Sequence, residues 1–114
     1  MNSRKVYIPQ LPTRWDVATQ QRVPSIDTNP ATVFGELVTV FGPDVSKEDA
    51  IAQLRAVGPP SIGPADYILA AGDVVLLVML VMGAINRNGR ATLLRWDGES
   101  KTYRTEEITE WQKI

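Results

Sequence analysis

The chain has 114 residues, of which 44% are hydrophobic and 22% are charged, and its net charge is −1; these values are ordinary for one globular domain. It contains no cysteine and no histidine, which excludes disulfides, thiolate zinc sites, cysteine nucleophiles and histidine bases. Its charges are balanced and spread along the chain, which disfavours a nucleic-acid partner, because nucleic-acid binding calls for a basic cluster. We also expect no cofactor.

Residues 1–34 are predicted to form a Pro-rich arm or hairpin packed on the rest of the domain. They hold four of the eight prolines, and proline cannot donate a hydrogen bond to a sheet. Thr13–Asp16 and Gln21–Val23 are expected to pair as a hairpin, because Asp16 followed by Thr19 is typical of an Asx turn. The first residues lack the apolar run of a signal peptide, so we expect an intracellular protein.

Residues 35–114 are predicted to be an α/β core, a small two-layer or three-layer domain with a short, mainly parallel sheet. The first strand of this core is Glu36–Phe41, which is rich in β-formers and ends at a Gly-Pro breaker. A helix follows, capped by Ser46 and terminated at Gly58. Its apolar positions share one face: Ala50, Ile51, Leu54 and Val57.

The next strand and helix form the predicted centre of the fold. Tyr67–Ala71 is apolar at every position, which is typical of a parallel strand buried on both faces. Asp73 is the expected N-cap of a helix over Val74–Ile85, which ends at Asn88-Gly89. A strand is the alternative for this β-branched segment, but its length and its caps favour a helix. Its twelve uncharged residues fall short of the roughly 20 that span a bilayer, so no membrane is expected.

The remaining residues predict a third parallel strand and an antiparallel one. Ala91–Trp96 is expected to turn at Asp97–Ser100 and to pair with Lys101–Ile108. The order β, α, β, α, β, β implies right-handed crossovers. The parallel strands lie in the order 1-2-3 if both helices cover one face, and 2-1-3 if they cover opposite faces. Arg-Trp-Asp occurs at both 14–16 and 95–97, which predicts two similar hairpin turns.

Gly72 and Asp73 are the candidate ligand-binding residues. They follow a predicted central strand, where open α/β sheets bind ligands, and a carboxylate there could hold Mg²⁺. Helix capping explains both residues without a ligand and is the favoured interpretation. No phosphate-binding glycine motif is present, and we assign no catalytic residue and no metal site. Two further charged groups are better explained by helix dipoles and solvation than by a site: acidic Asp44, Glu48 and Asp49 beside Asp73, and basic Arg87, Arg90 and Arg95.

The helix over Val74–Ile85 is apolar on every side, so something must cover its outer face. The cover is the Pro-rich arm, a second copy of the chain in a dimer, or a partner protein. An aromatic binding platform of Trp15, Trp96 and Trp111 is disfavoured relative to packing of these residues in the core and at its rim. The expected interaction surface comprises Val75, Leu76, Met79, Met82, Trp15 and Trp96.

A series of short segments runs through most of the chain in a recognisable order. The main ones are Ile8-Pro9, Arg14-Trp15-Asp16, Arg22-Val23-Pro24, Gly35-Glu36-Leu37, Asp66-Tyr67, Gly72-Asp73 and Leu94-Arg95-Trp96-Asp97. Together they resemble small, uncharacterised proteins of tailed bacteriophages. The resemblance implies a viral origin and a protein that works in the host cytoplasm or in the virion, and it carries over no catalytic residue.

Three hypotheses about function follow. The first is a non-enzymatic phage accessory protein that regulates replication or host function by protein–protein contact. The second is a Mg²⁺-dependent enzyme or nucleotide-binding module that uses Asp73. The third is a structural component of the virion.

Overall fold

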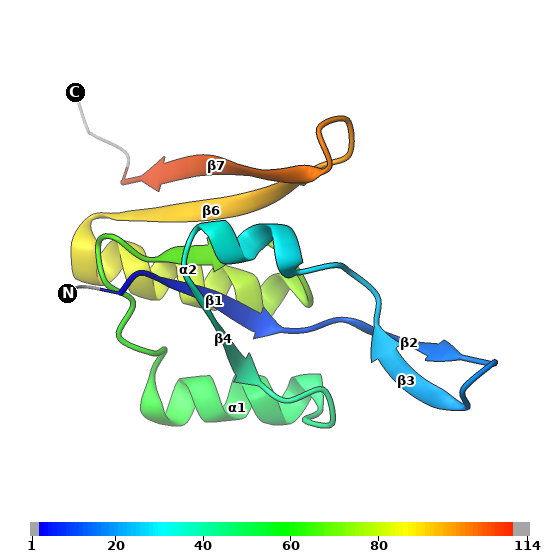
Figure 1. The fold of residues 1–114 in the computed structure, drawn as a ribbon. Coiled ribbons are helices and arrows are strands. Elements are labelled where there is room, and N and C mark those ends of the chain that lie inside the picture. The colour runs from blue at the N-terminus through cyan, green and yellow to red at the C-terminus, as the bar shows by residue number, and fades with distance from the viewer. Residues whose placement is uncertain (1–2, 111–114) are drawn as a thin grey trace.

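The computed structural model describes residues 3–110, which form a mixed α/β domain (Figure 1). The elements in chain order are β1 Lys5–Gln10, β2 Thr13–Asp16, β3 Gln21–Pro24, the 3₁₀ helix η1 Asn29–Val33, β4 Glu36–Phe41, α1 Lys47–Val57, β5 Tyr67–Leu69, α2 Val74–Asn88, β6 Arg90–Asp97 and β7 Thr102–Thr109. Within these residues, no helix combines the length and the apolar character needed to cross a bilayer.

A five-stranded sheet with the order β4-β1-β5-β6-β7 organises the domain. Its first four strands are parallel, and β7 pairs antiparallel with β6 at one edge. Both helices contribute to the core cluster on one face of the sheet, whereas the segment around η1 contributes to the cluster on the other. The prediction of a mixed α/β domain with a mainly parallel sheet and an antiparallel last strand is therefore confirmed.

The prediction that Lys5–Gln10 belongs to an N-terminal arm is wrong, because this segment is β1, near the middle of the sheet. It lies between β4 and β5, and Val6 and Ile8 are buried. The strand accommodates Pro9 because its pairing with β5 ends at Tyr7 and its register with β4 skips Pro9, so the missing amide costs no hydrogen bond of the sheet.

The three crossover connections between parallel strands have the same handedness. The link from β1 to β4 runs over the η1 face, whereas the links from β4 to β5 and from β5 to β6 run over the helical face in the opposite direction. Reversing both the face and the direction preserves handedness, as expected for parallel strands. Because both helices cover one face, the three predicted parallel strands do take the order 1-2-3, with β1 inserted after the first.

Both helices begin and end at the predicted caps. The Ser46 hydroxyl accepts a hydrogen bond from the Asp49 amide at 3.1 Å, and Gly58 ends α1 with φ +81°. Helix α2 begins at Val74, after Asp73, and ends at Gly89, which takes the left-handed conformation. Val74–Ile85 is thus a helix rather than a strand, and the helix continues to Asn88.

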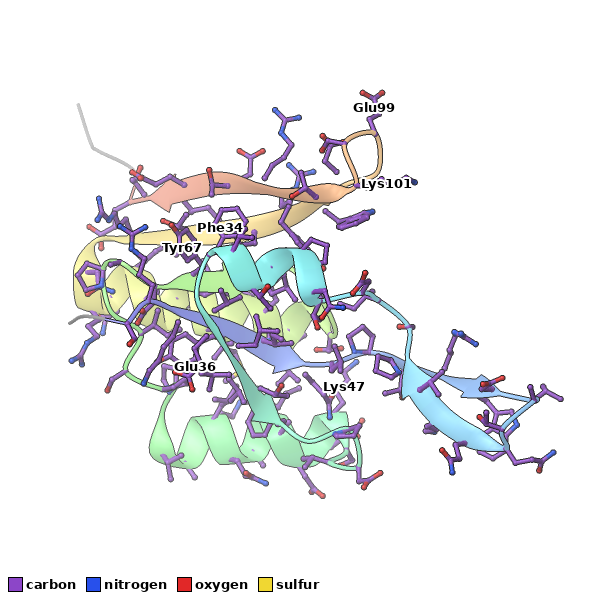
Figure 2. All side chains as sticks on the ribbon, viewed as in Figure 1. Phe34, Glu36, Lys47, Tyr67, Glu99 and Lys101 are labelled. Carbon is purple, nitrogen blue, oxygen red and sulfur yellow. The ribbon has the colours of Figure 1, made fainter. Side chains whose placement is uncertain are left out.

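The two faces of the sheet are each covered by a hydrophobic cluster. The helical side contains Leu76, Leu80 and Ala84 of α2, together with Leu54 of α1 and Ile68 of β5. The other side is closed by Ile26, Ala31 and Phe34, which pack against the far faces of the same strands. Phe34 meets Tyr67 edge-on, with ring centroids 5.3 Å apart, on this second side (Figure 2).

The predicted hairpin is present as β2 and β3, which project from the body of the domain (Figure 1). Its second strand is Gln21–Pro24, one residue longer than expected. The Asp16 carboxylate accepts hydrogen bonds from the Ala18 amide at 3.1 Å and from the Thr19 hydroxyl at 3.0 Å. Gln20 then takes φ +58° and closes the turn.

The second Arg-Trp-Asp copy builds the same turn between β6 and β7, as predicted. The Asp97 carboxylate accepts from the Glu99 amide at 3.1 Å and from the Ser100 hydroxyl at 2.9 Å. Lys101 takes φ +56°, matching Gln20 in the first copy. The repeat is therefore a repeated local turn.

Candidate functional site

Helix α2 leaves an apolar surface open to solvent. Leu76, Leu80 and Ala84 face the core, whereas the opposite face is exposed. Positions 74, 78 and 82 are four residues apart and form one line along the helix. We call the exposed set the α2 stripe; it comprises Val74, Val75, Val78 and Met82, which are 66%, 40%, 47% and 63% exposed.

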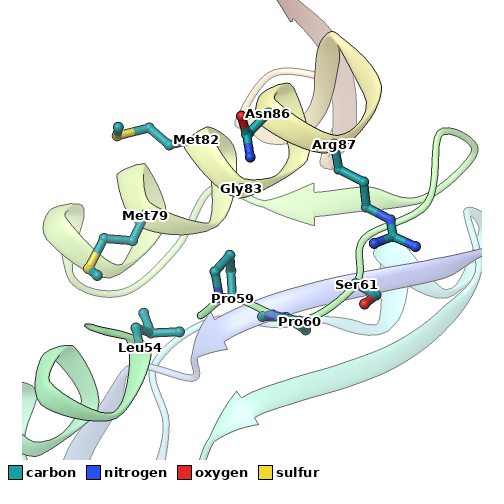
Figure 3. Close-up of a pocket in the computed structure, with 9 residues that line it drawn as sticks. All are labelled: Leu54, Pro59, Pro60, Ser61, Met79, Met82, Gly83, Asn86 and Arg87. Carbon is teal, nitrogen blue, oxygen red and sulfur yellow. The ribbon is translucent and has the colours of Figure 1, made fainter. Parts of the chain in front are cut away.

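A groove of about 520 Å³ borders this stripe where α2 meets the end of α1 and the loop that follows it (Figure 3). Its volume is in the range of small-molecule sites on proteins. The α1–α2 groove is lined by Leu54, Pro59, Pro60, Ser61, Met79, Met82, Gly83, Asn86 and Arg87.

Gly83 makes the groove possible by bringing the loop against α2. A Cβ atom at this position would overlap Cγ of Pro59. The ring of Pro59 therefore occupies the space that a side chain would fill, between the two ends of the groove (Figure 3). One end carries Leu54 and the methionines, and the other carries Ser61, Asn86 and Arg87.

Within the part of the chain that the structure describes, the groove carries a single charge. None of its lining residues is acidic, and Arg87 is the one cation among them. Among residues 3–110, the ion pairs are Lys47–Asp73 and Arg95–Glu106, so Arg87 has no carboxylate partner there. The surface is thus apolar along most of its length and positive at one end.

The predicted interaction residues do not form one surface. Leu76 is 0% exposed, so its place in the predicted surface is wrong: it faces the core. Val75 and Met82 belong to the stripe, and Met79 is half-buried at the groove.

The predicted tryptophans lie elsewhere. Trp15 is on the projecting hairpin. Trp96 stacks edge-on against Tyr103, which belongs to the cluster on the η1 face of the sheet. These two rings therefore do not extend the α2 stripe, and Trp111 lies outside the described residues.

Asp73 is a helix cap and an ion-pair partner. Its carboxylate accepts from the amides of Val75 at 2.9 Å and Leu76 at 3.2 Å, and it lies 3.3 Å from the Lys47 ammonium. Burial would raise the pKa of Asp73, but the Leu76 amide, Lys47 and the Val75 amide together lower the pKa below its usual value. The carboxylate thus joins the starts of α1 and α2.

Neither the acidic group nor the basic group considered from the sequence assembles into a site. Among residues 3–110, no three acidic side chains come close enough to hold a metal ion, so Asp44, Glu48 and Asp49 do not join Asp73. The predicted basic group is divided as well. Arg90 donates to the Pro64 carbonyl, Arg95 pairs with Glu106, and Arg87 points to the groove.

A second hollow of about 290 Å³ lies where β5 and β6 end, the edge at which open α/β sheets bind ligands. It is lined by Ser25, Ile26, Asp27, Ala70, Ala71, Trp96 and Tyr103. The Tyr103 hydroxyl donates to the Asp27 carbonyl at 3.1 Å. Burial, followed by the nearby Asp27 charge, raises the pKa of Tyr103, so this phenol remains protonated.

Sequence reasoning missed the groove. Its signals were a lone glycine inside an apolar helix and a Pro-Pro pair after the preceding helix. Each is readable as a local feature, since glycine is tolerated in helices and proline terminates them. Only the contact between Gly83 and Pro59 shows that the two belong together.

Comparison with known proteins gives one family. The family described as Phage Pam3 gp32-like protein matches residues 4–110, which is almost the whole chain. No curated protein and no solved structure matches the sequence.

Proposed function

The chain belongs to the phage Pam3 gp32-like protein family, and from this premise we propose that it is a non-enzymatic phage accessory protein that regulates replication or host function by protein–protein contact. We place this activity in the host cytoplasm, at the α2 stripe and the α1–α2 groove.

The exposed α2 stripe is the observation that carries the proposal. Met82 is 63% exposed and Val78 is 47% exposed on a helix that has no charged residue from Val74 to Ile85. Large contiguous apolar patches are uncommon on soluble monomers and often mark a site of interaction. Burying such side chains against a partner would remove apolar area from water, which favours association.

The residue types present in the chain also favour a non-enzymatic role. Without cysteine or histidine, an enzyme would depend on carboxylates, lysine, tyrosine or hydroxyl groups. The best-placed carboxylate, Asp73, is engaged by two helix amides and Lys47. These contacts make it a structural group rather than a free base.

Affinity capture from host and infected-cell lysates tests the proposal with matched surface variants. Met82→Lys places a charge on the stripe, and Val17→Lys places one on the projecting hairpin, where Val17 is 74% exposed. A specific partner should be retained by the wild type and by Val17→Lys and lost with Met82→Lys. Equal recovery on all three baits, or no specific protein on any, contradicts the proposal.

A Mg²⁺-dependent or nucleotide-binding module is the second candidate, favoured by the hollow and by Asp73 near the ends of the parallel strands. This function predicts that Mg²⁺ or a nucleotide raises the melting temperature and that Asp73→Asn removes the rise. If neither Mg²⁺ nor a nucleotide changes the melting temperature, this candidate function is contradicted and Asp73 serves only as a helix cap.

A role in the virion is the third candidate and agrees equally with the family. Mass spectrometry of purified particles separates it from the first proposal. Stoichiometric amounts of the chain in particles would move the site of action from the cytoplasm to the virion.

A further inference from the structure

We propose that the α1–α2 groove receives an amphipathic helix of a partner protein, whose apolar side chains contact Met79 and Met82 and whose acidic side chain pairs with Arg87. This inference rests on the proposed function, because it names the kind of partner that the same face would take.

The charge of the groove selects an acidic partner. Arg87 is its only charged lining residue and has no ion pair among residues 3–110. A guanidinium presents several donors in one plane and binds a carboxylate through two of them. Asn86 and Ser61 line the same end and could donate to the same oxygens.

The apolar end selects the rest of the partner. Leu54, Met79 and Met82 come from two different helices and form the wall of a groove rather than a flat patch (Figure 3). Such grooves receive the apolar face of a helix, and methionine side chains adapt to its shape.

The length of the groove sets the spacing on the partner. Met79 and Arg87 are eight residues apart on α2, which corresponds to roughly 12 Å along the helix axis. A helix lying alongside would therefore carry its acidic residue about two turns from its apolar anchor.

A second copy of the chain fits this surface less well. An isologous contact would bring the α2 stripe of one copy to the groove of the other. The acidic residue next to the stripe is Asp73, and its carboxylate is already engaged by Lys47 and by two amides of α2, so it offers Arg87 no free partner.

Selection of helical peptides from a randomised display library tests the proposal on the full chain. The wild type should enrich peptides with Asp or Glu about seven or eight positions from Leu, Ile or Met. Arg87→Gln should keep the apolar preference and lose the acidic one, and Arg87→Glu should enrich Lys or Arg instead. Arg55→Gln, which removes a charge from the last turn of α1 outside the groove, is the matched control and should select as the wild type does.

A selected peptide then provides a quantitative check. Replacing its acidic residue by the neutral amide should weaken binding to the wild type roughly tenfold and leave binding to Arg87→Gln unchanged. Asn86→Glu, which places a carboxylate beside Arg87, should reduce the acidic preference without removing the arginine. An acidic preference that survives Arg87→Gln overturns the proposal.

The outcomes separate this inference from the proposed function. Peptides that Met82→Lys rejects, but that show no dependence on Arg87, refute the acidic helix and leave the docking face standing. Peptides that bind Met82→Lys as well as the wild type, or the absence of any enriched peptide, count against both. Sedimentation that shows a wild-type dimer and a Met82→Lys monomer assigns the face to a second copy and overturns the inference.

Discussion

Pro59 packs its ring directly onto Gly83, so the loop after α1 touches the backbone of α2 where the helix has no side chain. This contact brings Leu54 and Pro60 to the same groove as Met79 and Met82. A residue that weakens an isolated helix is thereby used to join two helices.

The contact between Gly83 and Pro59 predicts that Gly83→Ala destabilises the protein when Pro59 is present and stabilises it when Pro59 is replaced by glycine. Gly83→Ala in the wild type should lower the free energy of unfolding by about 1–3 kcal/mol, because the new methyl group overlaps a rigid ring. With Pro59→Gly, the same change should stabilise by up to about 1 kcal/mol, since alanine is the better helix former. Urea unfolding of the wild type, the two single variants and the double variant measures this double-mutant cycle. Stabilisation by Gly83→Ala in both backgrounds would show that Pro59 does not pack tightly on Gly83.

Gly72 should tolerate no side chain. Its φ is +83°, and a Cβ atom there would lie 2.5 Å from the Gln10 carbonyl oxygen at the end of β1. We expect Gly72→Ala to cost at least about 1–2 kcal/mol of the free energy of unfolding, from the left-handed backbone alone. Gly42→Ala is the control, because no atom lies within 4 Å of its Cβ position. Similar losses in chemical denaturation for the two variants would refute this account of Gly72.

The two faces of α2 should respond differently to truncation. Leu80→Ala removes a side chain that is 0% exposed and should lower the free energy of unfolding by about 2–5 kcal/mol. Met82→Ala, on a side chain that is 63% exposed, should change it by less than about 0.5 kcal/mol. Thermal and urea unfolding give both values, and a large loss for Met82→Ala would mean that the stripe is already covered within the protein.

Stability should fall in acid partly through the Asp97 turn. Hydrogen bonds from the Ser100 hydroxyl and the Glu99 amide lower the pKa of Asp97 in the folded protein below its usual value of 3.8. A lowered folded pKa contributes stability that is present above the unfolded pKa and is lost as the pH falls through the folded pKa. The loss between about pH 4 and the folded value should therefore be smaller in Asp97→Asn than in the wild type.

The cause of this pH effect can be isolated at Ser100. Ser100→Ala should move the pKa of Asp97 back toward 3.8, as followed by NMR titration of its carboxyl group. Ser61→Ala, at a serine of the groove, should leave that titration unchanged. If Ser100→Ala leaves the pKa of Asp97 unchanged, groups other than the Ser100 hydroxyl lower that pKa.

The sequence by itself determined the features that depend on a few neighbouring residues. Ser46 and Asp73 were readable as caps because their side chains bind amides two or three residues away. The two Arg-Trp-Asp turns were readable as a pair for the same reason. The family could also be recognised, since its pattern of short segments lies in the sequence itself.

Only the tertiary structure decided which segments meet. Nothing local in Lys5–Gln10 reveals that it lies between β4 and β5, because its partners are some 30 and 60 residues away. Nothing in a helix that is apolar all round says that Leu76 faces the core and Met82 faces water. Burial of a side chain depends on what packs against it, and that is set by contacts far apart in the chain; the groove at Gly83 and Pro59 is one of them.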